Sequence, residues 1–340
     1  MNAHGGKAVA CNGNQISKIK IKGFKSIREA EIDLGMLNVL IGANGAGKSN
    51  FVSIFRLLKG QNAQKIQSYI TQQGGPERIL YMGSKTTPEA VFQLFSKDAE
   101  RKIVLLPTNG GSMSTVESLP DTDECFRWGV YHFHDTSDTA HMKKPCGLND
   151  NIELASDGRN LAAYLYRLSE TEGQSYQRIV KTIRQVASFF DDFVLRPNPL
   201  NENIIQLEWT RIDSDIPFLA TQISDGTLRF ICLATLLLQP SHLAPDTIII
   251  DEPELGLHPY AITLLGAMVK SASIDKQIIL STQSVDLLNE FDVENVIVVE
   301  HIDNASSFRR LSVEELRVWL EDDYSLGELW CKNVLGGRPS

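Results

Sequence analysis

Cysteine is sparse in this sequence and follows no recognisable spacing. The 340 residues include five cysteines, and no two of them stand in a C-x-x-C arrangement: Cys11, Cys125, Cys146, Cys232 and Cys331. Neither a disulfide framework nor a cysteine-rich zinc site is therefore indicated. Scattered cysteines of this kind are typical of a reducing compartment, and we expect a cytoplasmic protein.

Long hydrophobic runs are also lacking. A membrane-spanning helix needs roughly 20 consecutive apolar residues, and no stretch approaches that length. Residues 1–14 are polar and glycine-rich, without the apolar segment of a signal peptide, and we expect them to form a disordered tail. We therefore expect no membrane contact. The 42% hydrophobic content is ample for one large or two modest domains.

Positive charge is in deficit, because 33 lysines and arginines face 42 acidic residues and the net charge is −9. This balance argues against a surface that coats DNA. A local exception is an early strand on which lysines alternate with isoleucines, followed closely by two more cations: Lys18, Lys20, Lys22, Lys25 and Arg28. Such a face is either a solvated edge strand protected by lysines or a contact for nucleic acid.

Histidines cluster only once, at His132, His134 and His141. The first two would share one face of a strand, which is a possible start of a metal site. No fourth ligand is apparent in the sequence.

The most informative segment present is Gly42–Ser49, which reads G-x-x-x-x-G-K-S. A short apolar run, Leu37–Ile41, precedes it, and residues 50–58 carry apolar side chains at helical spacing, so the segment connects a strand to a helix. In this context backbone N–H groups converge on phosphate oxygens, Lys48 reaches the terminal phosphates and the Ser49 hydroxyl ligates Mg²⁺. We predict nucleotide contacts from Gly42, Asn44, Gly45, Ala46, Gly47, Lys48, Ser49 and Asn50.

A second motif follows the apolar run Thr247–Ile250, which suits a strand buried on both faces. It ends in the acidic sequence Asp251–Glu254. Adjacent side chains at a strand end point to opposite sides, so Asp251 can support Mg²⁺ while Glu252 deprotonates an attacking water. The alternative is a surface acidic cluster that caps the next helix.

The residues after this acidic sequence lead into a predicted helix, Tyr260 to Ser271, with Pro259 in its first turn. His258 stands just outside that helix. It could reach across a subunit interface toward a nucleotide or simply cap the helix, and the sequence favours neither role.

A third motif, Ile223–Phe230, leads into the apolar helix Ile231 to Leu238. Ser224 and Asp225 suit an N-cap region, and Gly226 permits close approach of another backbone. A helix start of this kind is a second anion site. Because one phosphate tail rarely needs two such sites, we expect Ser224 and Gly226 of one subunit to close over the nucleotide held by Lys48 of another. Hydrolysis would then require a dimer, unless this is only a helix cap.

A fourth motif comes at the end of the apolar run Gln277–Leu280, where the sequence continues Ser281–Ser284. Polar side chains at the end of this strand would lie beside the γ-phosphate. Gln283 is the residue that we place there.

Together these motifs resemble ABC-type ATPases of the RecF and SMC group, and most of all their short "predicted ATPase" branch, often labelled AAA-family. The resemblance extends from Ile16 to the last residue and includes three further segments: Lys22–Ser26, Tyr131–Ser137, and Gly327–Trp330 with Gly336–Pro339. It implies an α/β P-loop NTPase of the ABC/SMC head type, with Walker A and Walker B motifs, that uses ATP and Mg²⁺. The mainly parallel core sheet would be joined by an antiparallel β-layer and a helical insert.

Some residues depart from the superfamily pattern. Transporter-type members have a Leu-Ser-Gly-Gly-Gln signature and a switch histidine, where this chain has Ile223–Thr227 and Gln283. Glutamine can donate a hydrogen bond to the γ-phosphate but cannot become cationic, which favours slow turnover. For the glutamine that senses Mg²⁺ in relatives, Gln72 and Gln73 are candidates by position only.

Spacing predicts the domain organisation, because a long segment separates Lys48 from Asp251 whereas Ser224 shortly precedes Asp251. We expect one discontinuous ATPase domain over 15–340, with a core of 15–75 and 216–340 and an inserted β/helical arm at 76–215. Strands are expected at 102–106, 128–133 and 203–210, and helices at 160–169 and 175–190. These helices are too short for the long coiled-coil arms of SMC proteins.

The resemblance implies three functions. One is an ATP-closed homodimer that regulates a DNA-directed process, in repair or phage defence. The second is a regulatory subunit of a toxin-like effector, such as a nuclease encoded beside it, without direct DNA binding; the acidity of the chain mildly favours it. The third, an energising subunit of a transporter, fits least because of the signature and switch residues.

Overall fold

A six-stranded sheet forms the centre of the computed structural model, which describes residues 15–59, 63–108, 110–118 and 126–337. The expected tail at 1–14 lies outside the described residues. The strand order is β17-β16-β3-β15-β14-β7, and every pair is parallel except β16 with β17. Its strands are β3 (Leu37–Ile41), β7 (Trp128–Tyr131), β14 (Thr247–Asp251), β15 (Gln277–Thr282), β16 (Val296–Ile302) and β17 (Ala305–Arg310).

A second, antiparallel sheet has the order β2-β1-β4-β5-β6. Its strands are β1 (Lys18–Phe24), β2 (Ile27–Asp33), β4 (Ala90–Phe95), β5 (Glu100–Pro107) and β6 (Met113–Ser118). This sheet is the expected antiparallel layer. The short helices α2 (Ala63–Gln72) and α3 (Pro76–Ile79) connect β3 and α1 to β4.

The lysine-rich strand β1 is not an edge strand, because it pairs with β2 on one side and β4 on the other. The edge-strand interpretation is therefore wrong. Two of its lysines instead face carboxylates on β2: Lys18 Nζ lies 2.6 Å from Glu31 Oε1 and 3.3 Å from Asp33 Oδ1, and Lys20 Nζ lies 3.0 Å from Glu31 Oε2. These exposed pairs leave less positive charge for an outside partner.

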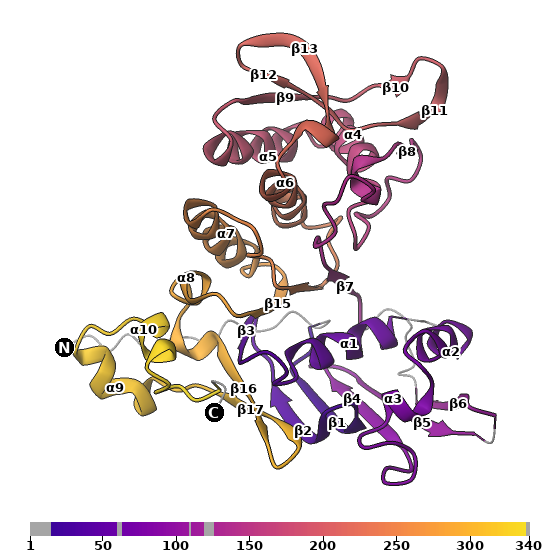
Figure 1. Ribbon diagram of the computed structural model, residues 1–340, viewed down its shortest axis with the longest axis vertical. Helices are drawn as coiled ribbons and strands as arrows, with labels where there is room; N and C mark the ends of the chain where they lie inside the picture. The colour runs from indigo at the N-terminus through magenta and orange to yellow at the C-terminus, as the bar shows by residue number, and fades with distance from the viewer. Residues whose placement is uncertain (1–14, 60–62, 109, 119–125, 338–340) are drawn as a thin grey trace.

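Helix α1 (Lys48–Leu58) lies between the two sheets (Figure 1). Its aromatic residues Phe51 and Phe55 are fully buried there, in a core that we call the inter-sheet core. Because strand side chains alternate between faces, Ile249 of β14 enters this core while Ile248 and Ile250 point to the other side of the sheet.

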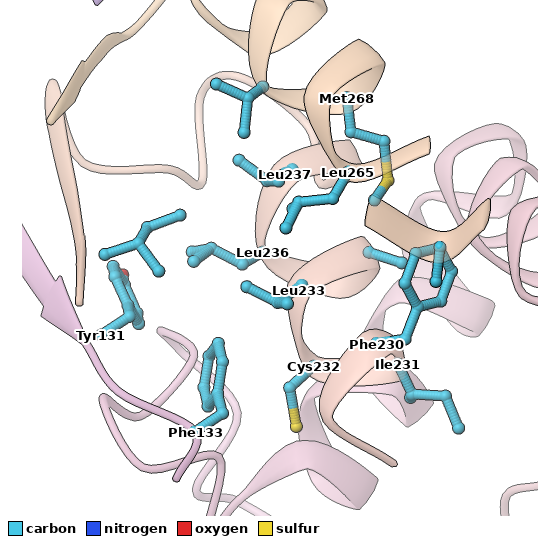
Figure 2. Close-up of a cluster of buried hydrophobic side chains, with 14 of the residues drawn as sticks. Tyr131, Phe133, Phe230, Ile231, Cys232, Leu233, Leu236, Leu237, Leu265 and Met268 are labelled. Carbon is cyan, nitrogen blue, oxygen red and sulfur yellow. The ribbon is translucent and has the colours of Figure 1, made fainter. Parts of the chain in front are cut away.

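Three helices cover that other side: α6 (Asp225–Leu238), α7 (Pro259–Ala272) and α8 (Val285–Leu288). Figure 2 shows α6 among side chains from its neighbours, with Leu265 and Met268 of α7 on one side and Tyr131 and Phe133 on the other. Every residue of α6 from Leu228 to Leu238 is buried, as the continuous apolar run predicts.

The segment between β7 and α6 forms an arm, which lies at the top of Figure 1. It contains α4 (Leu161–Thr171), α5 (Gly173–Val186) and two small sheets, β10-β11-β8 and β13-β12-β9. The expected strand at 203–210 is two strands in different sheets, β11 (Asn201–Ile205) and β12 (Glu208–Arg211). The sequence hides the break because buried Ile205, Leu207 and Trp209 keep the alternation across it. The remaining arm strands are β8 (Cys146–Gly147), β9 (Phe190–Val194), β10 (Pro197–Asn198) and β13 (Ser214–Leu219).

The segment 76–215, proposed above as one insert, is distributed over three parts of the structure. Strands β4 to β6 extend the sheet of β1, and β7 is an edge strand of the six-stranded sheet. Only the chain between β7 and α6 forms the arm, which supports a smaller insert than proposed. At the other end of the sequence, α9 (Val313–Glu321) and α10 (Leu326–Cys331) follow β17. Across the ranges described above, none of the helices is long and apolar enough to cross a membrane.

Candidate nucleotide site

The glycine-rich loop runs from the end of β3 to the start of α1, as its sequence predicts. At two positions in this loop, steric contacts explain why the residue is glycine. A Cβ at Gly42 would overlap the carbonyl oxygen of Val299 on β16, and a Cβ at Gly47, which has φ 117°, would overlap Ser306 Oγ. The loop therefore fits so closely against β16 and β17 that only glycine is accommodated at these positions.

Hydrogen bonds from distant segments hold this loop. Ser306 Oγ donates to the carbonyl of Ala46 at 2.7 Å, and the Ala43 N–H donates to the carbonyl of Gly337 at 2.8 Å. The Asn50 side chain, predicted to contact nucleotide, donates to Ser26 Oγ at 2.7 Å. The loop conformation is thus fixed by the surrounding protein.

Lys48 lies folded along the loop, with Nζ 2.5 Å from the Gly42 carbonyl and 3.1 Å from that of Ala43. Burial lowers the pKa of Lys48, and the carboxylates of Glu252, Asp251 and Glu254 oppose that shift. The next residue, Ser49, is exposed in the first turn of α1. The cation and the loop amides suit phosphate oxygens, and the hydroxyl is a suitable ligand for Mg²⁺.

Asp251 ends β14 and is nearly buried. Its carboxylate accepts from Ser281 Oγ at 2.5 Å and pairs with Arg56 of α1 at 3.2 Å. His134 Nε2 lies 2.9 Å from the backbone carbonyl oxygen of Asp251. Sequence reasoning placed Asp251 but missed Arg56, whose position two turns after Lys48 was the available signal.

Glu252 has φ 44°, a left-handed conformation that is unusual for a residue other than glycine. Its N–H donates to the Ser281 carbonyl at 2.9 Å, and its carboxylate accepts from Gln283 Nε2. The two residues that the sequence assigned to the attacking water and the γ-phosphate thus contact each other directly.

Glu254 is half-buried and contacts the residues at the end of β15. Its Oε1 accepts from Thr282 Oγ1 at 2.6 Å and from the Gln283 N–H at 3.1 Å, while its Oε2 has no hydrogen-bond partner among the described residues. Burial raises the pKa of Glu254, although these hydrogen bonds counteract the shift. The contacts make Glu254 a support for the switch residues at the end of β15.

The third motif starts α6, on the opposite side of the six-stranded sheet from α1 (Figure 1). Ser224 is exposed and caps the helix, accepting from the Thr227 N–H at 3.3 Å. A Cβ at Gly226 would overlap the carbonyl of Gly256, so this glycine has a close backbone contact within its own chain. This packing alone explains the glycine, and the contact of Gly226 with a nucleotide held by a second subunit stays a prediction.

Arg229, one turn into α6, is a residue that sequence reasoning missed. Its guanidinium is buried and donates to three carbonyls: Phe133 at 2.8 Å, His134 at 3.2 Å, and Leu255. Burial lowers the pKa of Arg229, opposed by nearby Asp225. The side chain therefore ties the start of α6 to the segments that follow β7 and β14.

An Arg229→Lys variant should lose about 3 kcal/mol of unfolding free energy, because lysine cannot reach three carbonyls in fixed directions and leaves some of them buried and unpaired. Urea unfolding measures the loss. The control is Arg178→Lys on α5, an exposed arginine whose one hydrogen bond within the described ranges goes to the Leu238 carbonyl. Equal stabilities of the two variants would contradict this role for Arg229.

The remaining candidates have other contacts. His258 caps α7 and is exposed, so the helix-cap role is observed and a contact across an interface stays a prediction. Gln73 accepts from Lys25 Nζ at 3.4 Å, which leaves the Mg²⁺-sensing glutamine unassigned. His132 and His134 have ring centroids 6.3 Å apart. Within the described part of the chain, no group of three or more His, Cys, Asp or Glu side chains could hold a metal ion.

Comparison with known proteins agrees with this geometry. A family model described as "AAA domain, putative AbiEii toxin, Type IV TA system" matches residues 37–289. The chain belongs to this family. The match spans the phosphate loop, the arm, the acidic motif and the switch strand, and it is consistent with the predicted resemblance to AAA-type ATPases. A search of curated proteins found no match.

Solved structures show the same fold. The chain is similar to an Smc head bound to the C-winged helix domain of ScpA (TM-score 0.60, 17% identity, covering 89% of this chain and 99% of that one). It is also similar to an Smc head with an extended coiled coil, bound to the C-terminal domain of ScpA and derived from Pyrococcus furiosus (0.60, 15%, 91% and 99%). A third is an Smc head with a coiled coil and joint from Pyrococcus yayanosii (0.59, 12%, 91% and 99%). The predicted fold, a P-loop NTPase of the SMC head type, is confirmed.

Proposed function

We propose that the protein binds and hydrolyses ATP and that two copies close around the nucleotide. The observation that carries this proposal is the convergence of Lys48, Asp251 and the Glu252–Gln283 pair at the carboxyl end of the parallel strands. Crevices at this edge are where open α/β sheets bind their ligands. The family and the fold support the same activity.

Each residue has a role in this proposal. Lys48 and the loop amides hold the phosphates, and Ser49 with Asp251 would hold Mg²⁺, which neutralises phosphate charge. Glu252 accepts the proton of the attacking water. Gln283 fixes the Glu252 carboxylate by donating to it and has an amide to offer the γ-phosphate.

The trans role of Ser224 and Gly226 stays a proposal, supported by the exposed, capped start of α6. A Ser224→Arg variant should bind ATP as a single subunit but neither dimerise nor turn over, because a bulky cation replaces a small cap at a tight interface. Nucleotide titration and sedimentation with ATP measure the two properties.

Mixing two inactive variants tests the geometry further. Ser224→Arg combined with Lys48→Ala places both lesions in one composite site and leaves the other intact, so part of the ATPase activity should return. Two copies of the same variant are the control, since they cannot form an intact site. A wild-type monomer that turns over ATP at full rate would contradict the composite site and leave Ser224 as a helix cap.

The biological role has two candidates, both for a cytoplasmic protein. A DNA-directed role, in repair or phage defence, is proposed from the RecF and SMC resemblance. Control of an effector, such as a nuclease or a toxin-like partner, is favoured by the pairing of Lys18 and Lys20 with the acids of β2. Co-purification with the product of the neighbouring gene would support the second, and salt-dependent DNA binding the first. A transporter subunit remains the least favoured assignment.

A further inference from the structure

A carboxylate stands where the composite site should receive a phosphate. Asp225 is the first residue of α6, directly after the exposed cap Ser224, and its side chain is 63% exposed. The N-terminus of a helix attracts anions, and the carboxylate of Asp225 already provides a negative charge there. An uncompensated carboxylate at this position would repel the partner's γ-phosphate.

Lys143 lies beside this carboxylate. It ends the short 3-10 helix His141–Lys143, and its side chain is only 3% exposed. Nζ lies 3.1 Å from Asp225 Oδ1 and 3.9 Å from Asp138 Oδ1, although the Asp138 side chain is 95% exposed. A buried lysine thus places its ammonium beside the exposed carboxylate at the start of α6.

The other charges around this pair do not replace Lys143. Arg229 acts on Asp225 at longer range, but its guanidinium donates to backbone carbonyls. Asp135 adds a further carboxylate, whose pKa is lowered mainly by hydrogen bonds from Ser137, with smaller contributions from His141 and Lys143. Lys143 is therefore the cation in direct contact with Asp225.

We propose that Lys143 is a positioning residue of the composite site, which neutralises Asp225 so that the start of α6 accepts the terminal phosphate of a nucleotide held by a second copy of this chain. This inference rests on the proposed ATP-closed dimer. It explains how the segment Ile223–Thr227, in which Asp225 follows Ser224, can contact the negatively charged phosphate of a partner's nucleotide. It also predicts that Lys143 is needed only while Asp225 carries its negative charge.

The test is a double-mutant cycle with ATP-dependent dimerisation as the readout. In Lys143→Gln, the ATP concentration for half-maximal dimerisation should rise about tenfold, as expected for an unpaired like charge at an interface. Single-subunit ATP binding should stay unchanged. Adding Asp225→Asn should restore dimerisation and turnover, and Lys143→Arg should resemble the wild type. The control is Lys144→Gln, which removes the adjacent, exposed lysine.

Failure of Asp225→Asn to rescue a folded Lys143→Gln variant would overturn the inference and make Lys143 a purely structural residue. If Lys143→Gln does not fold, Asp225→Asn alone should lower the required ATP concentration, because it removes a negative charge and keeps the cation; unchanged or weaker dimerisation would overturn the inference. A wild-type chain that does not dimerise with ATP would instead contradict the proposed dimer itself.

Discussion

A Glu252→Gln variant will bind ATP with wild-type affinity and hydrolyse it at least about 100-fold more slowly, the lower end of what a general base contributes. The amide keeps the shape of the side chain and can still accept from Gln283. It cannot take a proton from water. Single-turnover hydrolysis and equilibrium nucleotide binding measure the two effects separately.

The control for this variant is Glu314→Gln, an exposed substitution at the start of α9. Wild-type turnover in Glu252→Gln would move the base to Glu254, the next carboxylate along the chain. Glu254→Gln would then show the loss. Accumulation of an ATP-bound dimer in Glu252→Gln would in addition support closure before hydrolysis.

A Lys48→Ala variant will bind ATP about 100-fold more weakly, corresponding to roughly 3 kcal/mol of charge-assisted contacts to phosphate. The substitution also removes a cation that lies near the carboxylates of Glu252, Asp251 and Glu254. ATP affinity is measured by calorimetry or by a fluorescent nucleotide.

Lys270→Ala is the matched control, since Lys270 lies exposed near the end of α7. It should bind ATP like the wild type. Unchanged affinity in Lys48→Ala would remove the phosphate-loop assignment and with it the proposed activity.

Sequence predicted the parts of the site that depend on local chemistry. The strand, loop and helix around Lys48 follow from apolar spacing and glycine placement, and the acids after β14 follow from a buried strand end. The contact between Glu252 and Gln283 was not predicted, but both residues were placed at neighbouring strand ends. Parallel pairing of β14 with β15 brings them together.

Contacts between distant segments could not be predicted in this way. In the sequence, Arg229 is simply an arginine at the start of an apolar helix. Only the packing of α6 shows to which carbonyls it donates. The alternating lysines of β1 suggested an edge strand, because the sequence does not show that β4 pairs with the second side of β1. The break between β11 and β12 is likewise set by tertiary pairing, which overrides local alternation.

The attachment of the phosphate loop to β16, β17 and Gly337 has a consequence during synthesis. The bond from Ser306 to Ala46 spans 260 residues, and Gly337 lies further along the chain. Contacts of such long sequence separation form late, since the intervening chain must first be ordered. A ribosome-bound nascent chain that already displays the entire glycine-rich loop will therefore capture no ATP until the strands that support this loop have emerged.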